Sequence, residues 1–255
     1  MTAGGSILFD VEQRVHRTAD ATSTVPVLYR ATTIFGAVYT VDPGVASSPF
    51  EGACIEPWPI SGGAAVLVVG LEHHASTAGP YRALAVALPA RRRGFEGTLL
   101  RFVVDMRAIE EQALWITALA STSAAARASG RALWGLPHET ADVQVTIDRA
   151  AEARVPGEIA LRCEPPRGPA LACPPLCLFG RAAERLCRTI AEVEGRVRVD
   201  VGSRAHLHIE GSGPLARAAR SRGLDRARPR LSFRADRVRA RLPLPSDTGP
   251  ITPRR

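Results

Sequence analysis

Short apolar segments broken by glycine and proline dominate the hydrophobic pattern of this chain. Several alternate large apolar residues with small or polar residues, the period-two pattern of β-strands whose two faces differ. Segment 81–90 places Leu84, Val86 and Leu88 on one face and alanines on the other, which suits a tightly curved barrel wall. Segment 62–76 contains a continuous apolar run, as expected for a strand buried on both faces. The pattern predicts strands at 25–44 (two strands ending at an Asp-Pro-Gly turn), 62–76, 81–90, 97–106, 111–120, 141–148, 157–164, 196–211 (two strands) and 230–245.

Helices are predicted between some of these strands. Ser121 or Thr122 can cap an alanine-rich helix whose C-terminal end falls at Gly130, because glycine is favoured just after the last helical residue. Residues 214–223 are predicted to form a short helix, and residues 182–195 a second helix, with strand over part of that segment as the alternative. The sequence contains no internal repeat and no dividing linker, so we expect one β-rich domain of the α+β class over residues 25–245. A flexible lead-in (1–24) and a polar tail (246–255) flank it.

The charge is concentrated near the C-terminus. From Ser212 onward there are twelve arginines and three aspartates, a net charge of +9. The whole chain carries +8, so the first 211 residues carry −1. Within 230–245 the arginines alternate with apolar residues such as Val238 and Leu242. This is the pattern of an amphipathic strand with one solvated face, and we prefer it to a disordered tail. The arginines also raise the possibility of a nucleic-acid binder, whose affinity would weaken steeply with increasing salt concentration. We expect no nucleic-acid partner.

The composition argues against several other classes. No run of about 18 uncharged apolar residues is present, so we expect no membrane span, and the first 25 residues lack a secretory signal. His206 and His208 share one strand face but lack an evident third ligand, so we expect no metal. The cysteines lack zinc-type spacing and predict reduced thiols in a cytoplasmic protein; they are Cys54, Cys163, Cys173, Cys177 and Cys187. No phosphate-binding glycine motif and no Gly-x-Ser-x-Gly element is present, and no cofactor is expected.

The segment "GRALWGLPHET" at 130–140 carries the candidate chemistry. A Gly-Leu-Pro turn follows Trp134 and leads directly to His138 and Glu139. In one interpretation Trp134 belongs to the core and the turn merely exposes His138. In the other, the turn fixes an imidazole that takes part in chemistry.

This segment resembles the acetoacetate decarboxylase-like superfamily, whose members carry Gly-Arg-Glu-x-Trp-Gly-Phe-Pro-Lys. "GPYRA" at 79–83 partly matches a second family element, Gly-x-Tyr-x-Glu. The order and spacing of the predicted strands are also similar over nearly the whole chain. The resemblance implies curved antiparallel sheets forming a cone or barrel around one pocket, often in an oligomer, and a lysine that forms a Schiff base with a β-keto acid.

The chain departs from that pattern at the reactive positions. His138 follows the proline where the family has lysine, and Ala83 replaces the glutamate of the second element. All 33 basic residues are arginine, so Schiff-base chemistry through a lysine is excluded. Histidine can instead accept and return a proton near neutral pH.

The resemblance and these departures predict two groups of site residues. The catalytic candidates are His138 for proton transfer, Glu139 to orient it unless it faces solvent, Tyr81 to donate to a carbonyl, and Arg82 to hold a carboxylate or enolate. The expected pocket-lining residues are Trp134, Leu136, His73 and Arg30. Only one of the adjacent residues His73 and His74 can enter a pocket, since neighbours on a strand point apart.

We therefore expect a lysine-independent lyase, cyclase or isomerase that acts on a small β-keto or polyketide-like compound by acid/base catalysis. We place it in specialised metabolism such as antibiotic biosynthesis, as a cytoplasmic homo-oligomer. The alternative is a member of the same superfamily that binds a small molecule without catalysis.

Overall fold

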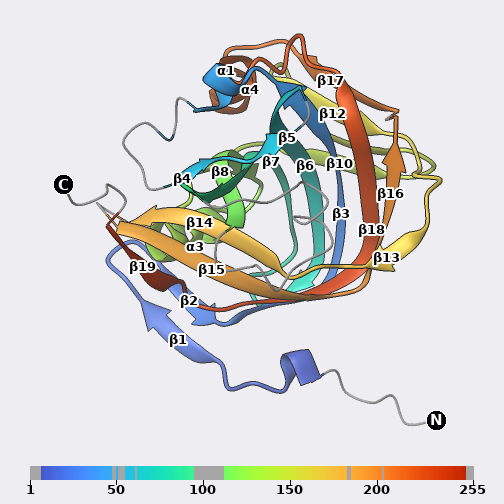
Figure 1. Cartoon of the computed structure of the whole chain (residues 1–255). Coiled ribbons are helices and arrows are strands. Elements are labelled where there is room, and N and C mark those ends of the chain that lie inside the picture. Colours follow the sequence, from blue (N-terminus) through green and yellow to red (C-terminus); the bar gives the residue numbers. More distant parts are fainter. Residues whose placement is uncertain are drawn as a thin grey trace.

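A large sheet that curves and closes on itself organises the molecule (Figure 1). The computed structural model describes residues 7–47, 50, 55–60, 62–94, 112–182, 185–202 and 204–250. The strand expected at 97–106 lies outside the described residues. Across the sheet the strands follow the order β13 (Ala170–Ala172), β16 (Arg196–Val201), β18 (Pro229–Leu242), β3 (Val27–Val41), β6 (Gly63–Ser76), β7 (Tyr81–Arg92), β8 (Gln112–Ser121), β14 (Leu176–Ala182), β15 (Arg185–Glu194) and β19 (Ser246–Pro250).

Strand β18 closes the sheet into a ring. It pairs with β3 on one side and with β15 on the other, so the path through β3, β6, β7, β8, β14 and β15 returns to β18. Neighbours in this ring are antiparallel, except for the parallel pair β8 and β14. The short strands β4 (Ile55–Pro57), β5 (Pro59–Ile60) and β9 (His138–Thr140) pair with β7, β6 and β8. The predicted β-rich fold with curved, largely antiparallel sheets and a few short helices is confirmed.

A second sheet covers the outer face of β3, β6 and β7. It contains β10 (Gln144–Ile147), β11 (Ala151–Val155), β12 (Ile159–Cys163) and β17 (Ala205–Ile209), with α1 (Pro43–Ser47) and α4 (Pro214–Ser221) packed nearby. The main core lies between these layers and includes Phe35, Val68, Leu84, Leu161 and Leu215, all at most 1 % exposed. Each such side chain contributes about 1.5–3 kcal/mol of burial free energy before entropy is counted.

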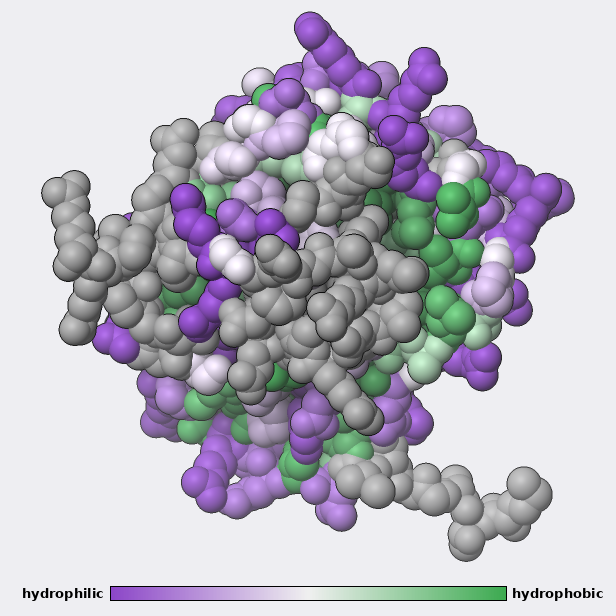
Figure 2. All heavy atoms as spheres, viewed as in Figure 1, coloured by the Kyte–Doolittle hydropathy of each residue, from purple (hydrophilic) through white to green (hydrophobic). Residues whose placement is uncertain are grey.

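The opposite face of the same strands lines the inside of the ring. Because side chains alternate along a strand, Leu67 and Ala87 lie between the outward-facing core residues and pack instead with Leu114. Leu178 of β14 and Val38 of β3 pack against these three apolar side chains from different parts of the ring. In Figure 2 hydrophilic side chains dominate the outline, and a hydrophobic area lies where Figure 1 shows β16 and β18.

Helix α3 (Ala124–Trp134) corrects the predicted helix at both ends. Its N-cap is Ser123, whose side chain accepts from the backbone of Ala126 at 3.1 Å. The helix also runs through Gly130 and ends at Gly135, which adopts the left-handed conformation with φ 60°. Burial of the final turn, including Trp134, outweighs the cost of an internal glycine, about 1 kcal/mol.

The helix expected within 182–195 is not found in the described part of that segment. From Arg185 to Glu194 the chain forms strand β15, paired with β14, β18 and β19. Helix-favouring alanine and glutamate are overridden here because the strand completes the ring. Strand β18 follows the prediction for 230–245, since Val238 and Leu242 are buried while Arg237 and Arg239 are exposed.

The two predicted flanking segments contain regular structure. Within 1–24 lie the 3₁₀ turn η1 (Ile7–Phe9), strand β1 (Arg14–Arg17) and the start of β2 (Thr22–Val25). Strand β3 then runs as one long strand where two were expected. Strand β19 falls within 246–255 and pairs with β15. Among the described residues, no helix combines the length and apolar character needed to cross a bilayer.

Candidate active site

Two tyrosines and a histidine form a polar cluster on the inner face of β3, β6 and β7. The hydroxyl groups of Tyr29 and Tyr81 lie 3.1 Å apart. The imidazole of His73 packs against both rings, with centroids 4.5 Å from Tyr29 and 4.3 Å from Tyr81. His73 and Tyr81 are direct partners in the β6–β7 register, so the sheet itself sets this contact. We call Tyr29, His73 and Tyr81 the inner cluster.

The surroundings keep the inner cluster uncharged at neutral pH. Burial lowers the pKa of His73 to about 3, and neighbouring His74 acts in the same direction. Burial raises the pKa of Tyr29, although its hydrogen bond to Tyr81 opposes this. Burial also raises the pKa of Tyr81 well above its usual value. The cluster therefore presents a neutral imidazole beside two phenol groups that retain their protons.

Two consecutive histidines repeat one arrangement on opposite faces of the sheet. His73 Nδ1 lies 2.9 Å from Thr32 Oγ1, and His74 Nε2 lies 3.0 Å from Thr33 Oγ1. His73 is buried on the inner face, whereas the His74 side chain is 43 % exposed. The bond of Nδ1 to Thr32 holds the ring of His73 and leaves Nε2 without a hydrogen bond to the described residues. Only His73 therefore reaches the inner face, because adjacent residues on a strand point to opposite faces.

His138 is buried beneath α3. Its side chain is 4 % exposed and its Nε2 lies 2.7 Å from Ser121 Oγ. A Cβ on Gly130 would come within 2.5 Å of Nδ1, so only glycine leaves room for this ring. Burial lowers the pKa of His138 to about 4; Arg127 and Arg131 add to this, and the backbone of Ala126 opposes it. The interpretation in which Trp134 belongs to the core and the turn merely exposes His138 is therefore confirmed for Trp134 and wrong for His138.

The strand register relates His138 to the inner cluster. Ser121 pairs with Ala83, which lies two residues along β7 from Tyr81 and therefore on the same face. Two residues of a strand span about 7 Å. His138 pairs with Leu119 on the other side of β8. The two buried imidazoles thus belong to neighbouring parts of one face.

Several predicted site residues lie on the other face. Glu139 is half exposed and forms an ion pair with Arg131 at 3.3 Å. Arg82 is 49 % exposed and pairs with Glu72 at 3.2 Å. Arg30 is exposed, with its guanidinium 5.3 Å from the ring centre of Phe9. Each directly follows an inward-facing residue, so strand alternation turns it outward. The structure does not bring these three charges to His138.

Trp134 and Leu136 pack behind the inner cluster. Trp134 is buried and donates from Nε1 to the Pro243 carbonyl at 2.9 Å. Leu136 is part-buried in the same apolar cluster, which Tyr29 also joins. Trp134 and Leu136 therefore support Tyr29 from the side of α3.

The sequence reasoning missed Tyr29, Thr32 and Ser121. Tyr29 directly precedes Arg30, which was the residue predicted to line the pocket. The alternation of the strand pattern identifies the face of Tyr29 only once a partner such as His73 is known. Thr32 and Ser121 carry no signal beyond being hydroxyl residues in apolar strands.

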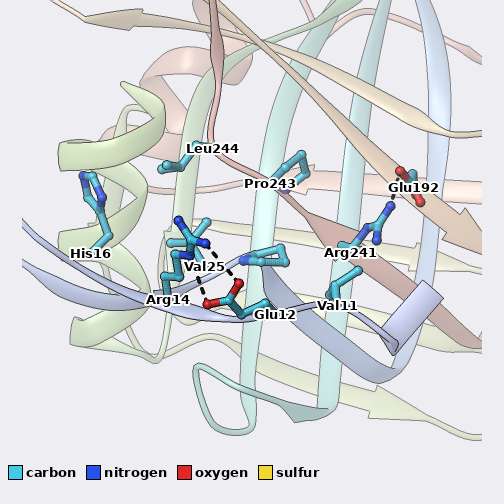
Figure 3. Close-up of a pocket in the computed structure, with 10 residues that line it drawn as sticks. Val11, Glu12, Arg14, His16, Val25, Glu192, Arg241, Pro243 and Leu244 are labelled. Atoms are coloured by element: carbon cyan, nitrogen blue, oxygen red, sulfur yellow. Dashed lines mark hydrogen bonds and ion pairs between the residues drawn. The ribbon is translucent and has the colours of Figure 1, made fainter. Parts of the chain in front are cut away.

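A separate hollow lies beside the N-terminal ribbon (Figure 3). It has a volume of about 450 Å³ and is lined by residues from β1, β15 and the end of β18. Its two arginines are each paired with a carboxylate, Arg14 with Glu12 and Arg241 with Glu192. This hollow is charge-balanced and contains none of the predicted site residues. Across the described ranges, no three His, Cys, Asp or Glu side chains gather in a way that could hold a metal ion.

Comparisons with known proteins establish the fold. No family model matches the chain, and no curated protein matches it. Among solved structures, acetoacetate decarboxylase from Legionella pneumophila gives a TM-score of 0.67 at 13 % identity, covering 88 % of each chain. The chain has the acetoacetate decarboxylase fold. A second acetoacetate decarboxylase structure gives 0.60 at 14 % identity, covering 88 % of this chain and 90 % of that one. The enduracididine biosynthesis enzyme MppR, complexed with pyruvate, gives 0.54 at 11 % identity, covering 87 % and 89 %.

Proposed function

We propose that the protein catalyses proton transfer on a small keto compound held against the inner cluster, without a Schiff base. When the substrate binds, the hydroxyls of Tyr29 and Tyr81 give up the hydrogen bond between them and both donate to the carbonyl oxygen of the substrate. The Nε2 of His73, which has no hydrogen bond to the described residues, removes a proton from the adjacent carbon, and the C–H electron pair moves into the enolate. The resulting imidazolium then returns the proton to a carbon or oxygen atom, or to a leaving group.

The observation that carries this proposal is the pair of phenol hydroxyls 3.1 Å apart beside an imidazole kept neutral by burial. Two preorganised donors stabilise an enolate oxygen more than a ground-state carbonyl, and this difference lowers the barrier. A phenol paired with a second acidic donor in an apolar site is an established way to stabilise an enolate. The enolate charge also raises the basicity of the imidazole as it forms.

The absence of lysine limits the chemistry. Without an imine as electron sink, the enolate must be stabilised by hydrogen bonds alone. This favours a lyase, cyclase or isomerase step over Schiff-base decarboxylation. The pyruvate complex of MppR, a protein of the same fold, supports a small keto acid or polyketide-like compound as substrate. We place the protein in specialised metabolism, in the cytoplasm and as a homo-oligomer.

His138 has a secondary place in this proposal. Its Nε2 is bonded to Ser121 and would have to leave that hydroxyl before it could reach a substrate. We therefore assign it to holding the strand beside the inner cluster and keep direct proton transfer as the role of His73. Glu139, Arg82 and Arg30, which face outward, do not touch the substrate in this proposal.

One observation favours the alternative of binding without catalysis. The hydroxyls of Tyr29 and Tyr81 are already bonded to each other, so the cluster is stable without a substrate. A binding protein would hold the keto compound and leave its α-protons in place.

Exchange of α-protons distinguishes the two. The protein is incubated in D₂O with pyruvate, acetopyruvate or a short 3-keto acid, and the loss of the α-proton signal is followed by NMR. We expect catalysed exchange with at least one of these compounds. Saturable binding with no exchange above buffer would support the binding alternative and contradict the catalytic proposal.

The Schiff-base question has a direct test. Borohydride traps an imine as a stable secondary amine, so treatment with acetoacetate should leave the mass of the protein unchanged. A stable adduct on any residue would contradict the absence of Schiff-base chemistry.

A further inference from the structure

Apolar residues continue the inner face of the sheet beyond the inner cluster, row by row. Leu71 is the next inward-facing residue of β6 after His73, and it pairs with Ile34 of β3. The two following rows contain Val69 and then Val38, which both pack inside the ring. Two residues of a strand span about 7 Å, so Val38 lies about 20 Å from the inner cluster along the strands.

Strands β18 and β16 extend these rows sideways. Leu231 of β18 pairs with Val38. Phe233 of β18 pairs with Gly36 on one side and with Val199 of β16 on the other. A Cβ on Gly36 would lie 2.7 Å from Cζ of Phe233, so the ring of Phe233 lies across β3 on the inner face. The rows therefore reach β16, where a hydrophobic area is visible in Figure 2.

The inner rows keep apolar surface accessible to solvent, unlike the outer face of the same strands. On the outer face, Phe35 and Val68 are 0 % exposed in the main core. Val201, at the β16 end of the inner rows, is 81 % exposed. The side chains between it and the inner cluster are only partly buried; they are Ile34, Val38, Val69, Leu71, Val199, Leu231 and Phe233. We call these seven residues the apolar face. Accessible apolar surface beside a few polar groups is typical of a ligand site.

Charged side chains of the neighbouring positions lie on the opposite face. Glu72 and Arg82 follow His73 and Tyr81 in the sequence and pair with each other outside the ring. Arg198 and Arg234 are partners in the β16–β18 register, directly beside residues of the apolar face, so strand alternation also turns them outward. A carboxylate on the apolar face would therefore lie among apolar side chains, where an unpaired charge is costly.

On this basis we propose that the substrate is an uncharged 1,3-diketone whose alkyl chain lies along the apolar face. The inference rests on the proposed function, because it places a diketone oxygen at the hydroxyls of Tyr29 and Tyr81. The chain then runs from Leu71 towards Phe233, and its methylene groups leave water. The proton between the two carbonyl groups moves to Nε2 of His73. Its electron pair is shared by both oxygens, which suits a site without an imine as electron sink.

Calorimetric titration at pH 7 with pentane-2,4-dione, undecane-2,4-dione and acetoacetate tests the proposal. Undecane-2,4-dione adds six methylene groups to the short diketone, and acetoacetate replaces one acetyl group by a carboxylate. Each fully buried methylene is worth about 0.8 kcal/mol, or about fourfold in affinity. Because the face buries the chain only in part, we expect undecane-2,4-dione to bind at least about tenfold more tightly than pentane-2,4-dione. Acetoacetate should bind about tenfold more weakly than pentane-2,4-dione.

Two variants locate the chain. Phe233→Ala should weaken undecane-2,4-dione about fivefold or more. It should leave pentane-2,4-dione unchanged, which also shows that the variant is folded. Val199→Asp should have the same selective effect, because it adds a charge to the apolar face. Val15→Asp is the matched control, since Val15 is 62 % exposed on β1 and lies outside this face.

The outcomes separate this inference from the proposed function. Equal affinity for the two diketones, tighter binding of acetoacetate than of pentane-2,4-dione, or unchanged affinity in both face variants would each overturn the inference. The two diketones should also compete with each other, and independent binding would place the chain elsewhere and overturn it as well. Exchange of the α-protons is followed by NMR on the same complexes. Chain-length-dependent binding without exchange would support the ligand class and contradict only the proposed catalysis.

Discussion

At the residue scale, the site depends on which of two adjacent side chains faces inward. His73 and His74 are chemically identical neighbours, each bonded to a threonine of β3. Burial separates them: His73 packs between two tyrosines and its pKa is lowered to about 3, whereas the His74 side chain is 43 % exposed. The same alternation places Tyr81 inside and Arg82 outside.

The tyrosine hydroxyls give the sharpest prediction at this scale. Tyr81→Phe removes one enolate donor and keeps the ring that packs on His73. Loss of one such donor lowers turnover by about 10²–10³, so we expect a fall of that size in the exchange rate. Because the loss is specific to the transition state, KM should change little. Unchanged exchange in this variant would remove the phenol pair from the mechanism.

At the element scale, the turn after α3 joins the helix to the sheet. Gly135 must be left-handed, and a Cβ there would lie 2.2 Å from the Arg181 carbonyl. The motif "WGLPHE" identified this turn from sequence. The helix boundary was missed because Gly130 resembles a helix end. The structure shows that Gly130 instead makes room for His138, a contact between segments that no local pattern reveals.

A pair of glycine substitutions tests this reading of the turn. Gly157 has φ 69° and open space around its Cβ position, whereas Gly135 has φ 60° and a backbone clash. Gly157→Ala should lower the free energy of unfolding by only about 1–2 kcal/mol, the cost of placing alanine in the left-handed conformation. Gly135→Ala should lower the free energy of unfolding clearly more, with both variants measured by urea titration. Equal losses would show that the contact with β14 relaxes freely.

At the scale of the whole molecule, the sequence predicts a curved β-sheet but not that this sheet closes into a ring. Alternating strands and the amphipathic 230–245 segment indicated a curved β-fold. Closure depends on β15, and its Ala- and Glu-containing sequence also favours a helix. The strand that closes the ring against β15 is β18, which is distant from β15 in the sequence, so local propensity could not settle the question.

The two buried histidines also predict how whole-molecule stability depends on pH. Both pKa values are lowered on folding, to about 3 and about 4, so below about pH 6.5 the unfolded chain binds protons that the folded chain does not. Their contribution to stability is present above pH 6.5 and is lost as the pH falls towards 4. Each histidine should contribute up to about 1.4 kcal/mol per pH unit in that window.

Urea titrations at pH 7 and pH 5 measure this slope. His138→Gln and His73→Gln should each reduce the loss of stability on acidification, because each removes one such group. His74→Gln, at a half-exposed position, is the control and should reduce the loss much less. If the unmodified protein and the three variants all lose the same stability between pH 7 and pH 5, the burial of both rings is contradicted.

The central claim is that His73, on the inner face, transfers the proton. The most direct measurement is the rate of α-proton exchange of the reactive keto compound in His73→Gln and His74→Gln side by side. The two changes remove the same group at adjacent positions, each bonded to a threonine of β3. We predict that His73→Gln loses about 10²-fold or more in exchange rate, while His74→Gln stays close to the unmodified protein. Equal rates in the two variants would contradict the account.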